Sequence, residues 1–304
     1  MPPGPFPYPI VGNIGQVPTE KPYVTFEKWS KDYNSPLDTL WTGNRPTVIA
    51  NDCWSASYLM DMRANIYSSR PASYLAGDML DDTENNQTNL VYGDKWRLHR
   101  RITLELKLSP KEIASLTGNL IGGGVDTTTT TILVFIFAMC AFPRVQQKAQ
   151  EEIDRVLAGE PRPPRWEDEQ SLPYCRALLT EIFRWRSAIA LGGPPHAPTQ
   201  DDVYNGMLIP AGTTIIGNLW AIHRNPRDYP NPDEVRPERF LDEAERRPNP
   251  SKRGIFTFGW GRRVCSGQPL AEQGVWFTIV ELLWAFRMRS VDEQPSASPA
   301  AIQR

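Results

Sequence analysis

The sequence predicts a single, mainly α-helical domain with small β-sheets, on the basis of three observations. Apolar side chains fall at helical spacing in residues 23–33 and, at three- and four-residue steps, in residues 269–286. Short apolar runs beside the turns at 43–46 and 205–206 predict strand pairs. The chain carries 29 prolines, where average usage would give roughly 15. This excess predicts long ordered loops between the regular elements.

The N-terminal part is expected to mix helices with one small sheet. Residues 1–20 form a proline-rich lead-in, which is too rich in proline for a helix and predicts an extended segment. Helices are expected over residues 23–33 and 52–62, on either side of a strand pair within residues 40–50.

A long central helix is predicted after a shorter helix over residues 93–105. Its start is marked by Ser109-Pro110-Lys111-Glu112, which has the form of a capping box with proline at the first helical position. It would end at about Phe142, because Pro143 breaks the chain. Its middle, residues 122–131, is rich in glycine and threonine, so intrinsic propensity by itself would not predict this helix.

The rest of the chain alternates helices, short strands and loops. A proline-rich stretch runs to about Lys252, and the polar residues 290–304 are expected to form a flexible tail. The expected elements are helices over 144–157, 172–185 and 269–286 and strands over 203–204, 207–209 and 213–216.

The composition narrows the possible functions. Hydrophobic residues make up 40% of the 304 and charged residues 22%, so the chain can bury a sizeable core. A net charge of −2 argues against a nucleic-acid surface, which would carry a basic excess. The four cysteines and three histidines show no zinc-binding spacing. No signal peptide or membrane span is expected, since the longest apolar run, 132–142, suits a buried helix better than a bilayer crossing.

The segment with the most specific chemistry surrounds Cys265. Glycines bracket this cysteine before the last predicted helix, and small residues let a backbone approach a flat ligand closely. At a helix N-terminus, unpaired N–H groups and the helix dipole stabilise a thiolate. Arg263 adds positive charge that can neutralise an anion. A structural cysteine beside a tight turn is the alternative, whereas the thiolate interpretation predicts a ligand for an iron porphyrin.

This segment resembles, position for position, the haem-ligand signature of the cytochromes P-450, F-x-x-G-x-R-x-C-x-G. The matching residues are Phe258, Gly261, Arg263, Cys265 and Gly267. Four further segments resemble landmarks of that family in the family's order. They are Trp96-x-x-x-Arg100, Gly123 to Thr128, Glu181-x-x-Arg184 and Pro237-Glu238-Arg239-Phe240. The resemblance covers nearly the whole chain and implies a cytochrome P-450 fold.

Each of these four landmarks has a simpler interpretation when taken alone. A glycine–threonine run in a helix more often marks close packing, and a phosphate loop is disfavoured because no lysine follows the glycines. A Glu–Arg pair three residues apart usually lies on a solvated helix face, where it contributes about 0.2–0.5 kcal/mol. A Trp and an Arg one turn apart are otherwise an ordinary amphipathic turn. Their occurrence together and in order favours the family interpretation.

The resemblance implies a role for each matched residue. Cys265 would be the axial ligand of the haem iron, and its electron donation would favour cleavage of the O–O bond. Asp126 and Thr127 would deliver protons during oxygen activation. The residues that would bind the cofactor with Cys265 are Trp96, Arg100, Gly123, His196, Phe258, Gly261, Arg263 and Gly267, of which Trp96, Arg100, His196 and Arg263 would hold the propionates. The residues of the implied structural network are Glu181, Arg184 and Arg239.

The implied reaction inserts one oxygen atom from O2 into a small lipophilic substrate of secondary metabolism, and the second atom leaves as water. The implied cofactor is haem b. Electrons would come from NADPH through a flavoprotein, the NADPH–cytochrome P-450 reductase, since nothing in the sequence resembles a flavin or nicotinamide domain. The resemblance implies the cytosolic face of the endoplasmic reticulum. No anchor is expected in this chain, which leaves a cytoplasmic location and peripheral membrane association both open.

The resemblance fails in three places. Only 22 residues separate Arg100 from Gly123, where the family has its helices D to H, and residues 106–109 are the expected deletion junction. The family's C-terminal β-hairpin would fall in residues 290–304, which have almost no apolar side chains. Met1 stands where a membrane anchor would end. Lost helices would expose apolar faces worth about 25 cal/mol per Å², against a net stability of about 5–15 kcal/mol. An incomplete distal pocket is therefore expected.

Two alternatives to an active monooxygenase follow. The first is a truncated, catalytically inactive family member that binds haem weakly or not at all, from a shortened gene or a mis-joined transcript. The second keeps haem but catalyses isomerisation or dehydration, and the Asp126–Thr127 pair argues against it. The substrate, the regiochemistry and the oligomeric state do not follow from the sequence.

Overall fold

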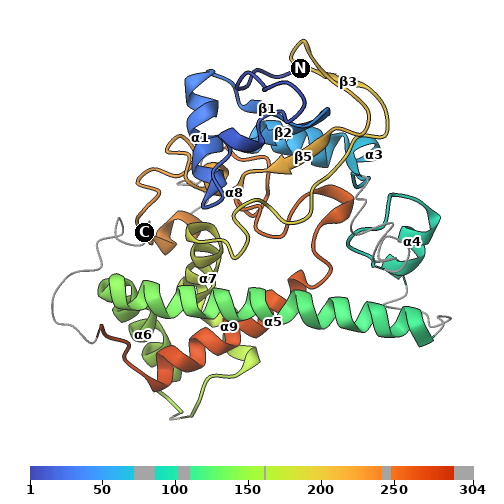
Figure 1. Cartoon of the computed structure of the whole chain (residues 1–304). Coiled ribbons are helices and arrows are strands. Elements are labelled where there is room, and N and C mark those ends of the chain that lie inside the picture. The colour runs from blue at the N-terminus through green and yellow to red at the C-terminus, as the bar shows by residue number, and fades with distance from the viewer. Residues whose placement is uncertain (72–85, 102–109, 161, 242–247, 291–304) are drawn as a thin grey trace. The chain divides into compact units, whose positions relative to one another are not determined.

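The computed structural model describes residues 1–71, 86–101, 110–160, 162–241 and 248–290 (Figure 1). The chain forms two compact units, each built from segments that are far apart in the sequence. Unit one comprises residues 1–123, 189–222 and 258–265, and unit two comprises residues 124–188, 223–257 and 266–304. Helices dominate and the sheets are small, as predicted. The predicted single-domain organisation stays a prediction beside this division. The expected junction at 106–109 and all of the expected tail except Ser290 lie outside the described residues.

Unit one contains a three-stranded sheet whose middle strand is β2. β1 (Leu37–Thr42) and β2 (Arg45–Ala50) pair antiparallel around the predicted turn. β5 (Thr214–Gly217) pairs in parallel with β2, with Ile215 opposite Val48. Both of these side chains are fully buried. The sequence predicted β5 but not its partner, because a parallel pair requires a long crossover that leaves no local turn signal. Helix α1 (Pro22–Asp32) lies beside β1 (Figure 1).

The remaining elements of unit one are short. A hairpin joins β3 (Asp202–Tyr204) to β4 (Met207–Ile209), and both residues of its turn, Asn205 and Gly206, have positive φ as such a turn requires. The others are the 3₁₀ helices η1 (Ile14–Gln16) and η6 (Gly261–Arg263), the helices α2 (Cys53–Ser57), α3 (Ala64–Tyr67) and α4 (Asp94–Arg101), and the π-helical turn η2 (Tyr58–Met62). α8 (Leu219–His223) continues from this unit into the second.

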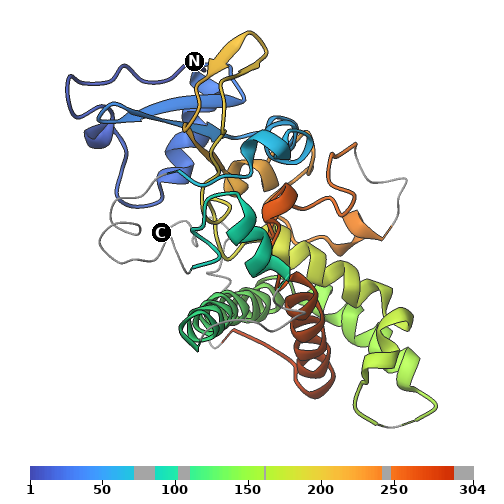
Figure 2. The same ribbon diagram turned by 90° about the vertical axis from the view of Figure 1, so that its right-hand side faces the viewer.

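Unit two is built on three helices that pack against one another. They are α6 (Pro143–Leu157), α7 (Pro173–Trp185) and α9 (Gln268–Ala285), and Figure 2 shows them from a second direction. Two 3₁₀ helices, η4 (Trp166–Ser171) and η5 (Pro237–Phe240), contact α7. Each of the three long helices begins with proline in its first turn, where the missing N–H has no intrahelical partner to lose.

The longest helix, α5 (Pro110–Ala141), begins at the predicted proline and ends just before Pro143. It crosses from unit one to unit two after Gly123. Its C-terminal part is packed, since Phe135, Ala138 and Met139 are fully buried. Its middle is exposed, with Val125 at 57% and Leu133 at 60%. The described residues therefore do not cover the apolar side chains in the middle of this helix.

Candidate functional site

The Cys265 loop, residues 258–265, is a tight turn that presents the cysteine to the surface. The Cys265 backbone N–H donates to the Phe258 carbonyl over 2.8 Å, which closes the loop. Gly259 and Gly261 have φ of +83° and +54°, in the region that favours glycine. The Cys265 side chain is exposed, and α9 begins three residues later. The loop therefore leaves a thiol accessible to a ligand.

Gly261 is required by a close approach within unit one. A Cβ at this position would lie 2.2 Å from the Met60 carbonyl oxygen, closer than any side chain tolerates. The Gly261 N–H also donates to the Asp61 carboxylate. The first glycine of the signature, Gly261, thus serves backbone packing against the π-helical turn η2.

Arg263 and Arg100 connect the Cys265 loop to neighbouring segments of unit one. The Arg263 guanidinium donates to the Ser68 carbonyl at 2.8 Å and to the Leu90 carbonyl at 2.6 Å. It also lies over the Trp96 ring, 4.5 Å from the centroid. Arg100 donates to the Val264 carbonyl at 2.7 Å and lies 5.9 Å from the same ring centroid. The predicted Trp96, Arg100 and Arg263 are thus brought together.

A third arginine, Arg70, belongs to this group and was not found from the sequence. It donates to the Thr88 carbonyl at 2.9 Å and to the carbonyls of Pro194 and Pro195 at 2.9 and 2.8 Å. Its positive charge lowers the pKa of both His196 and Arg263. A lone arginine so far from the signature carries no local signal, so only the fold could find it. We call Arg70, Arg100 and Arg263 the arginine cluster.

The arginine cluster has an excess of positive charge. Burial lowers the pKa of Arg70 to about 10, and burial followed by the charges of Arg70 and Arg100 lowers the pKa of Arg263 to about 9. Burial also lowers the pKa of Arg100. Within the described residues, Arg70 and Arg263 donate to carbonyl oxygens and neither pairs with a carboxylate. An anionic ligand would relieve this repulsion.

His196 is buried beside the arginine cluster. Its Nδ1 lies 2.9 Å from the Tyr67 carbonyl, and its backbone pairs with Ile215. Because a carbonyl only accepts, Nδ1 carries the proton in the neutral ring. Burial, and then the charges of Arg70 and Arg263, lower the pKa of His196 to about 3. The ring is therefore neutral, and its predicted contact with a propionate stays a prediction.

The α7 network (Glu181, Arg184 and Arg239) lies in unit two and is almost completely buried. Arg184 pairs with Glu181 through two bonds of 2.7 and 2.8 Å, and both side chains are fully buried. Arg239 approaches the same carboxylate at 3.4 Å. Arg184 also donates to the carbonyls of His223 and Pro232. The solvated-face interpretation of the Glu–Arg pair is wrong, because tertiary packing encloses it.

Asp126 and Thr127 lie on the exposed middle of α5. Asp126 is exposed and Thr127 is half-buried, and the Thr131 hydroxyl donates to the Thr127 carbonyl at 2.8 Å. A Cβ at Gly122, Gly123 or Gly124 would meet nothing within 4 Å, so packing in the described part of the chain does not require these glycines. The close-packing interpretation of these glycines is therefore not supported by the described residues.

Two of the predicted groups are each assembled within one unit. Trp96, Arg100, Arg263 and His196 gather in unit one with the Cys265 loop, and the α7 network forms in unit two. Asp126 and Thr127 belong to unit two and Cys265 to unit one, and each unit is described by itself.

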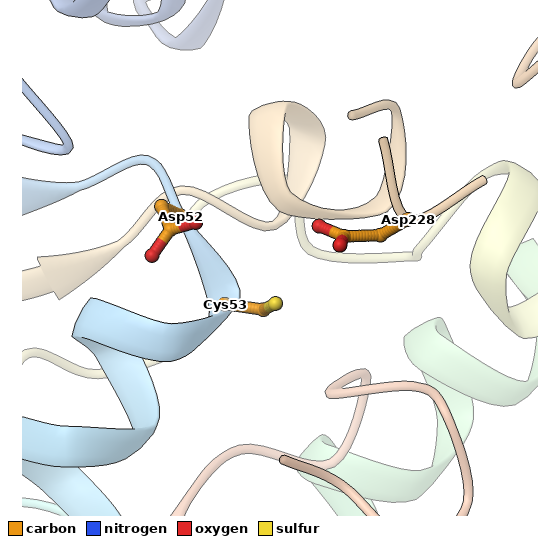
Figure 3. A group of neighbouring side chains, drawn as sticks. All are labelled: Asp52, Cys53 and Asp228. Carbon is orange, nitrogen blue, oxygen red and sulfur yellow. The ribbon is translucent and has the colours of Figure 1, made fainter. Parts of the chain in front are cut away.

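Figure 3 draws Asp52, Cys53 and Asp228, which carry ligand types that metals use. Asp52 caps α2 by accepting from the Ser55 N–H at 2.8 Å, Cys53 is buried, and Asp228 pairs with Arg227. These residues come from both units, and each carboxylate has a local structural partner, so no metal site is assigned to them.

Unit two has two hollows, of about 230 and 600 Å³. The smaller is lined by Arg236, Arg239 and Lys252, and the larger by Phe183, Trp276 and other residues of α7 and α9. Neither is lined by Cys265, Asp126 or Thr127.

One helix of the described chain, α5, is long and apolar enough between Thr117 and Ala141 to cross a membrane by length and composition. No membrane span was predicted from the sequence, because the longest unbroken apolar run covers only residues 132–142. The core helix of a globular protein passes the same test, and this segment carries Asp126 and three glycines near its middle.

Comparison with known proteins gives consistent matches. The family model named Cytochrome P450 matches residues 2–106 and 103–301. Cytochrome P450 monooxygenase 113 of Postia placenta is 43% identical over 190 residues, 62% of this chain and 38% of that protein. A cytochrome P450 monooxygenase of Aspergillus aculeatus is 41% identical over 188 residues, 60% of this chain and 35% of that protein. The aligned part of the chain thus spans little more than a third of the length of these curated relatives.

Among solved structures, a zebra fish cytochrome P450 with abiraterone matches with a TM-score of 0.73 at 20% identity. The match covers 87% of this chain and 91% of that chain. At this identity the likeness shows the fold, and it confirms the predicted mainly α architecture with small sheets.

Proposed function

Because this chain belongs to the cytochrome P450 family, whose members hold haem, we propose that it is a haem-thiolate monooxygenase with Cys265 as the iron ligand. Its substrate would be a small lipophilic molecule and its cofactor haem b. Electrons would come from NADPH through a partner reductase that docks at the cytosolic face of the endoplasmic reticulum. Family members in general use a redox partner and lipophilic substrates.

One observation carries this proposal: an exposed thiol lies in the same unit as the buried Arg263 and the half-buried Arg70, which have no carboxylate partner among the described residues. A thiolate is a ligand for haem iron, and carboxylate groups such as propionates are anions that guanidinium groups bind well. The donor set therefore fits iron protoporphyrin. Arg70, Arg100 and Arg263 would hold the propionates, with Trp96 beneath two of the guanidinium groups.

The chain's own residues would position the cofactor and move protons. When bound, haem supplies the redox chemistry that activates O2 and oxidises the substrate. Gly259 and Gly261 hold the loop in a turn from which the Cys265 thiol projects without steric hindrance. The Thr127 carbonyl accepts a hydrogen bond from the Thr131 hydroxyl. The Thr127 hydroxyl would relay protons from the Asp126 carboxyl, which is exposed to solvent. The α7 network takes no part in the reaction.

A second candidate function, a family member that does not retain haem, is favoured by the exposed middle of α5. Val125 is 57% exposed and Leu133 is 60% exposed on the helix that carries Asp126 and Thr127. Side chains of this kind are normally covered in a working pocket, which is mostly apolar and largely enclosed.

The carbon monoxide difference spectrum of the purified, haem-supplied and reduced chain separates the two functions. A monooxygenase should show a strongly red-shifted Soret band that Cys265→Ala abolishes, while Cys140→Ala, a control on the same chain, leaves it unchanged. Survival of the band in Cys265→Ala would refute the ligand assignment. Absence of haem uptake by the unmutated chain would favour the second function.

A further inference from the structure

His223 joins the α7 network to the segment just before the Cys265 loop. His223 is the last residue of α8 and is 2% exposed. Its Nε2 accepts the Phe256 backbone N–H at 2.9 Å, and its Nδ1 lies 3.1 Å from the Ser187 hydroxyl. The His223 carbonyl accepts from Arg184 at 2.8 Å. One residue thus makes contacts to both parts of the chain through its ring and its backbone.

These contacts determine the tautomer of the ring. A backbone N–H can only donate, so Nε2 must present its lone pair to Phe256 and the proton of the neutral ring sits on Nδ1. Nδ1–H then donates to the Ser187 hydroxyl, which in turn donates to the Phe183 carbonyl at 2.9 Å. Burial, and then the charge of Arg184, lower the pKa of His223 to about 3, so the ring is neutral at ordinary pH.

The segment before the loop is held at a second point. The Thr257 hydroxyl donates to the same Phe183 carbonyl at 2.9 Å. The Phe256 ring also stacks on the imidazole, with centroids 6.4 Å apart. Two successive residues are therefore attached to the last turn of α7 and to His223.

The next residue along the chain begins the Cys265 loop. Phe258 supplies the carbonyl that accepts the Cys265 N–H at 2.8 Å. The position of Phe258 is limited by Thr257, to which it is covalently joined. The contacts of His223 therefore restrict the base of the loop without touching the cysteine.

A serine beside a histidine also suggests a nucleophile and its base, and the geometry excludes that interpretation. A base must accept the serine proton, but Nδ1 is the protonated nitrogen and Nε2 is occupied by Phe256. The Ser187 proton is directed to a carbonyl instead. The Ser187–His223 pair is a structural support.

We propose that His223 is a positioning residue for Cys265: its Nε2 lone pair holds the Phe256 N–H and so sets the backbone from which the Cys265 loop departs. This inference rests on the proposed function for its meaning, since it concerns the orientation of the iron ligand. The matched substitutions are His223→Gln, whose side-chain oxygen can accept near the position of Nε2, and His223→Leu, which has a similar volume and no acceptor. Ser187→Ala is the control, because it leaves Nε2 in place.

The experiment measures amide hydrogen exchange in the full-length, haem-free chain. In His223→Leu the amide of Phe256 should exchange faster by about tenfold, the factor expected for one lost hydrogen bond. The amide of Cys265 should also exchange faster, by a smaller factor, because its own bond to the Phe258 carbonyl remains. His223→Gln should restore most of that protection, and Ser187→Ala should change it little. In haem-supplied samples the thiolate-type fraction of the carbon monoxide spectrum should fall in His223→Leu and recover in His223→Gln.

Unchanged exchange at Cys265 in a folded His223→Leu chain would overturn the inference. Should that variant not fold, nitrogen-15 NMR of the unmutated chain decides the matter, since a proton on Nε2 contradicts the proposed contact and a proton on Nδ1 supports it. Because these readouts need no haem, they can fail or succeed independently of the Cys265→Ala spectrum.

Discussion

The two units treat buried arginine in opposite ways. In unit two, Arg184 is fully buried against the Glu181 carboxylate, and its remaining N–H groups donate to carbonyls. In unit one, the half-buried Arg70 and the buried Arg263 also donate to carbonyls, but they pair with no carboxylate in the described part of the chain. A buried charge is costly unless it is paired. The first group is therefore complete as a structural element, whereas Arg70 and Arg263 have no carboxylate partner among the described residues.

This difference distinguishes arginines that stabilise the fold from arginines that would bind a ligand. Removing one partner of a buried ion pair leaves the other charge uncompensated, so the variant loses folding stability. Removing Arg263, which pairs with no carboxylate among the described residues, relieves repulsion, so the variant should lose affinity for the anion that the arginine cluster would bind. Three predictions test this contrast, in order of decreasing effect.

Arg184→Met should have the largest effect. It leaves the Glu181 carboxylate buried and short of its main partner, which should lower the free energy of unfolding by about 3–5 kcal/mol. Arg176→Met is the matched control on the same helix, because Arg176 is 58% exposed and its pair with Glu169 should contribute at most about 1 kcal/mol. Urea denaturation of the haem-free chain measures both. Equal losses in the two variants would show that the α7 network is not the structural element described here.

Asp38 tests a buried carboxyl that pairs with no cation in the described ranges of the chain. Burial raises its pKa from 3.8 to about 7, although the amide of Asn51 donates to Oδ2 and lowers it. The folded chain therefore binds this proton more tightly than the unfolded chain does. Its contribution to stability is complete below pH 3.8 and is lost as the pH rises through 7.

Between pH 5 and 8 the unmutated chain should lose about 2–3 kcal/mol relative to Asp38→Asn. Asp168 is the contrasting case in unit two, because its pair with Arg162 lowers the pKa of the carboxyl to about 2. Asp168→Asn should therefore shift stability by a constant amount over that range. Thermal unfolding at several pH values gives the comparison, and parallel curves for Asp38→Asn and the unmutated chain would contradict the prediction.

Arg263→Met should have the smallest effect on folding. The carbonyls of Ser68 and Leu90 lose a donor, while Arg70 and Arg100 lose a repulsive neighbour, so the haem-free chain should change by about 1–2 kcal/mol at most. Haem should raise the midpoint of thermal unfolding in the unmutated chain and in Arg262→Met, the adjacent exposed control, but much less in Arg263→Met. A loss of stability as large as that of Arg184→Met would remove the contrast between the units.

Several features of the fold could be predicted because their signals are local. The start of α5 at Pro110 follows from a capping pattern, and the turn between β3 and β4 follows from Asn205-Gly206. The contact between β2 and β5 could not be predicted, because the strands are separated by most of the chain and pair in parallel. Arg70 was missed for the same reason, since its partners at Pro194 and Pro195 are distant in sequence.

The sequence by itself determined the family signature around Cys265 and the identity of the residues in the α7 network, because fixed spacing of distinctive residue types survives without knowledge of the fold. Only the tertiary structure decided which charges are buried and which of them are paired. Burial and pairing depend on segments that meet after folding. η5 brings Arg239 to Glu181, while Arg70, in the same unit as Cys265, donates to carbonyls and pairs with no carboxylate among the residues that the structure describes. That difference in charge pairing distinguishes the α7 network, which stabilises the fold, from the arginine cluster, which would bind an anion.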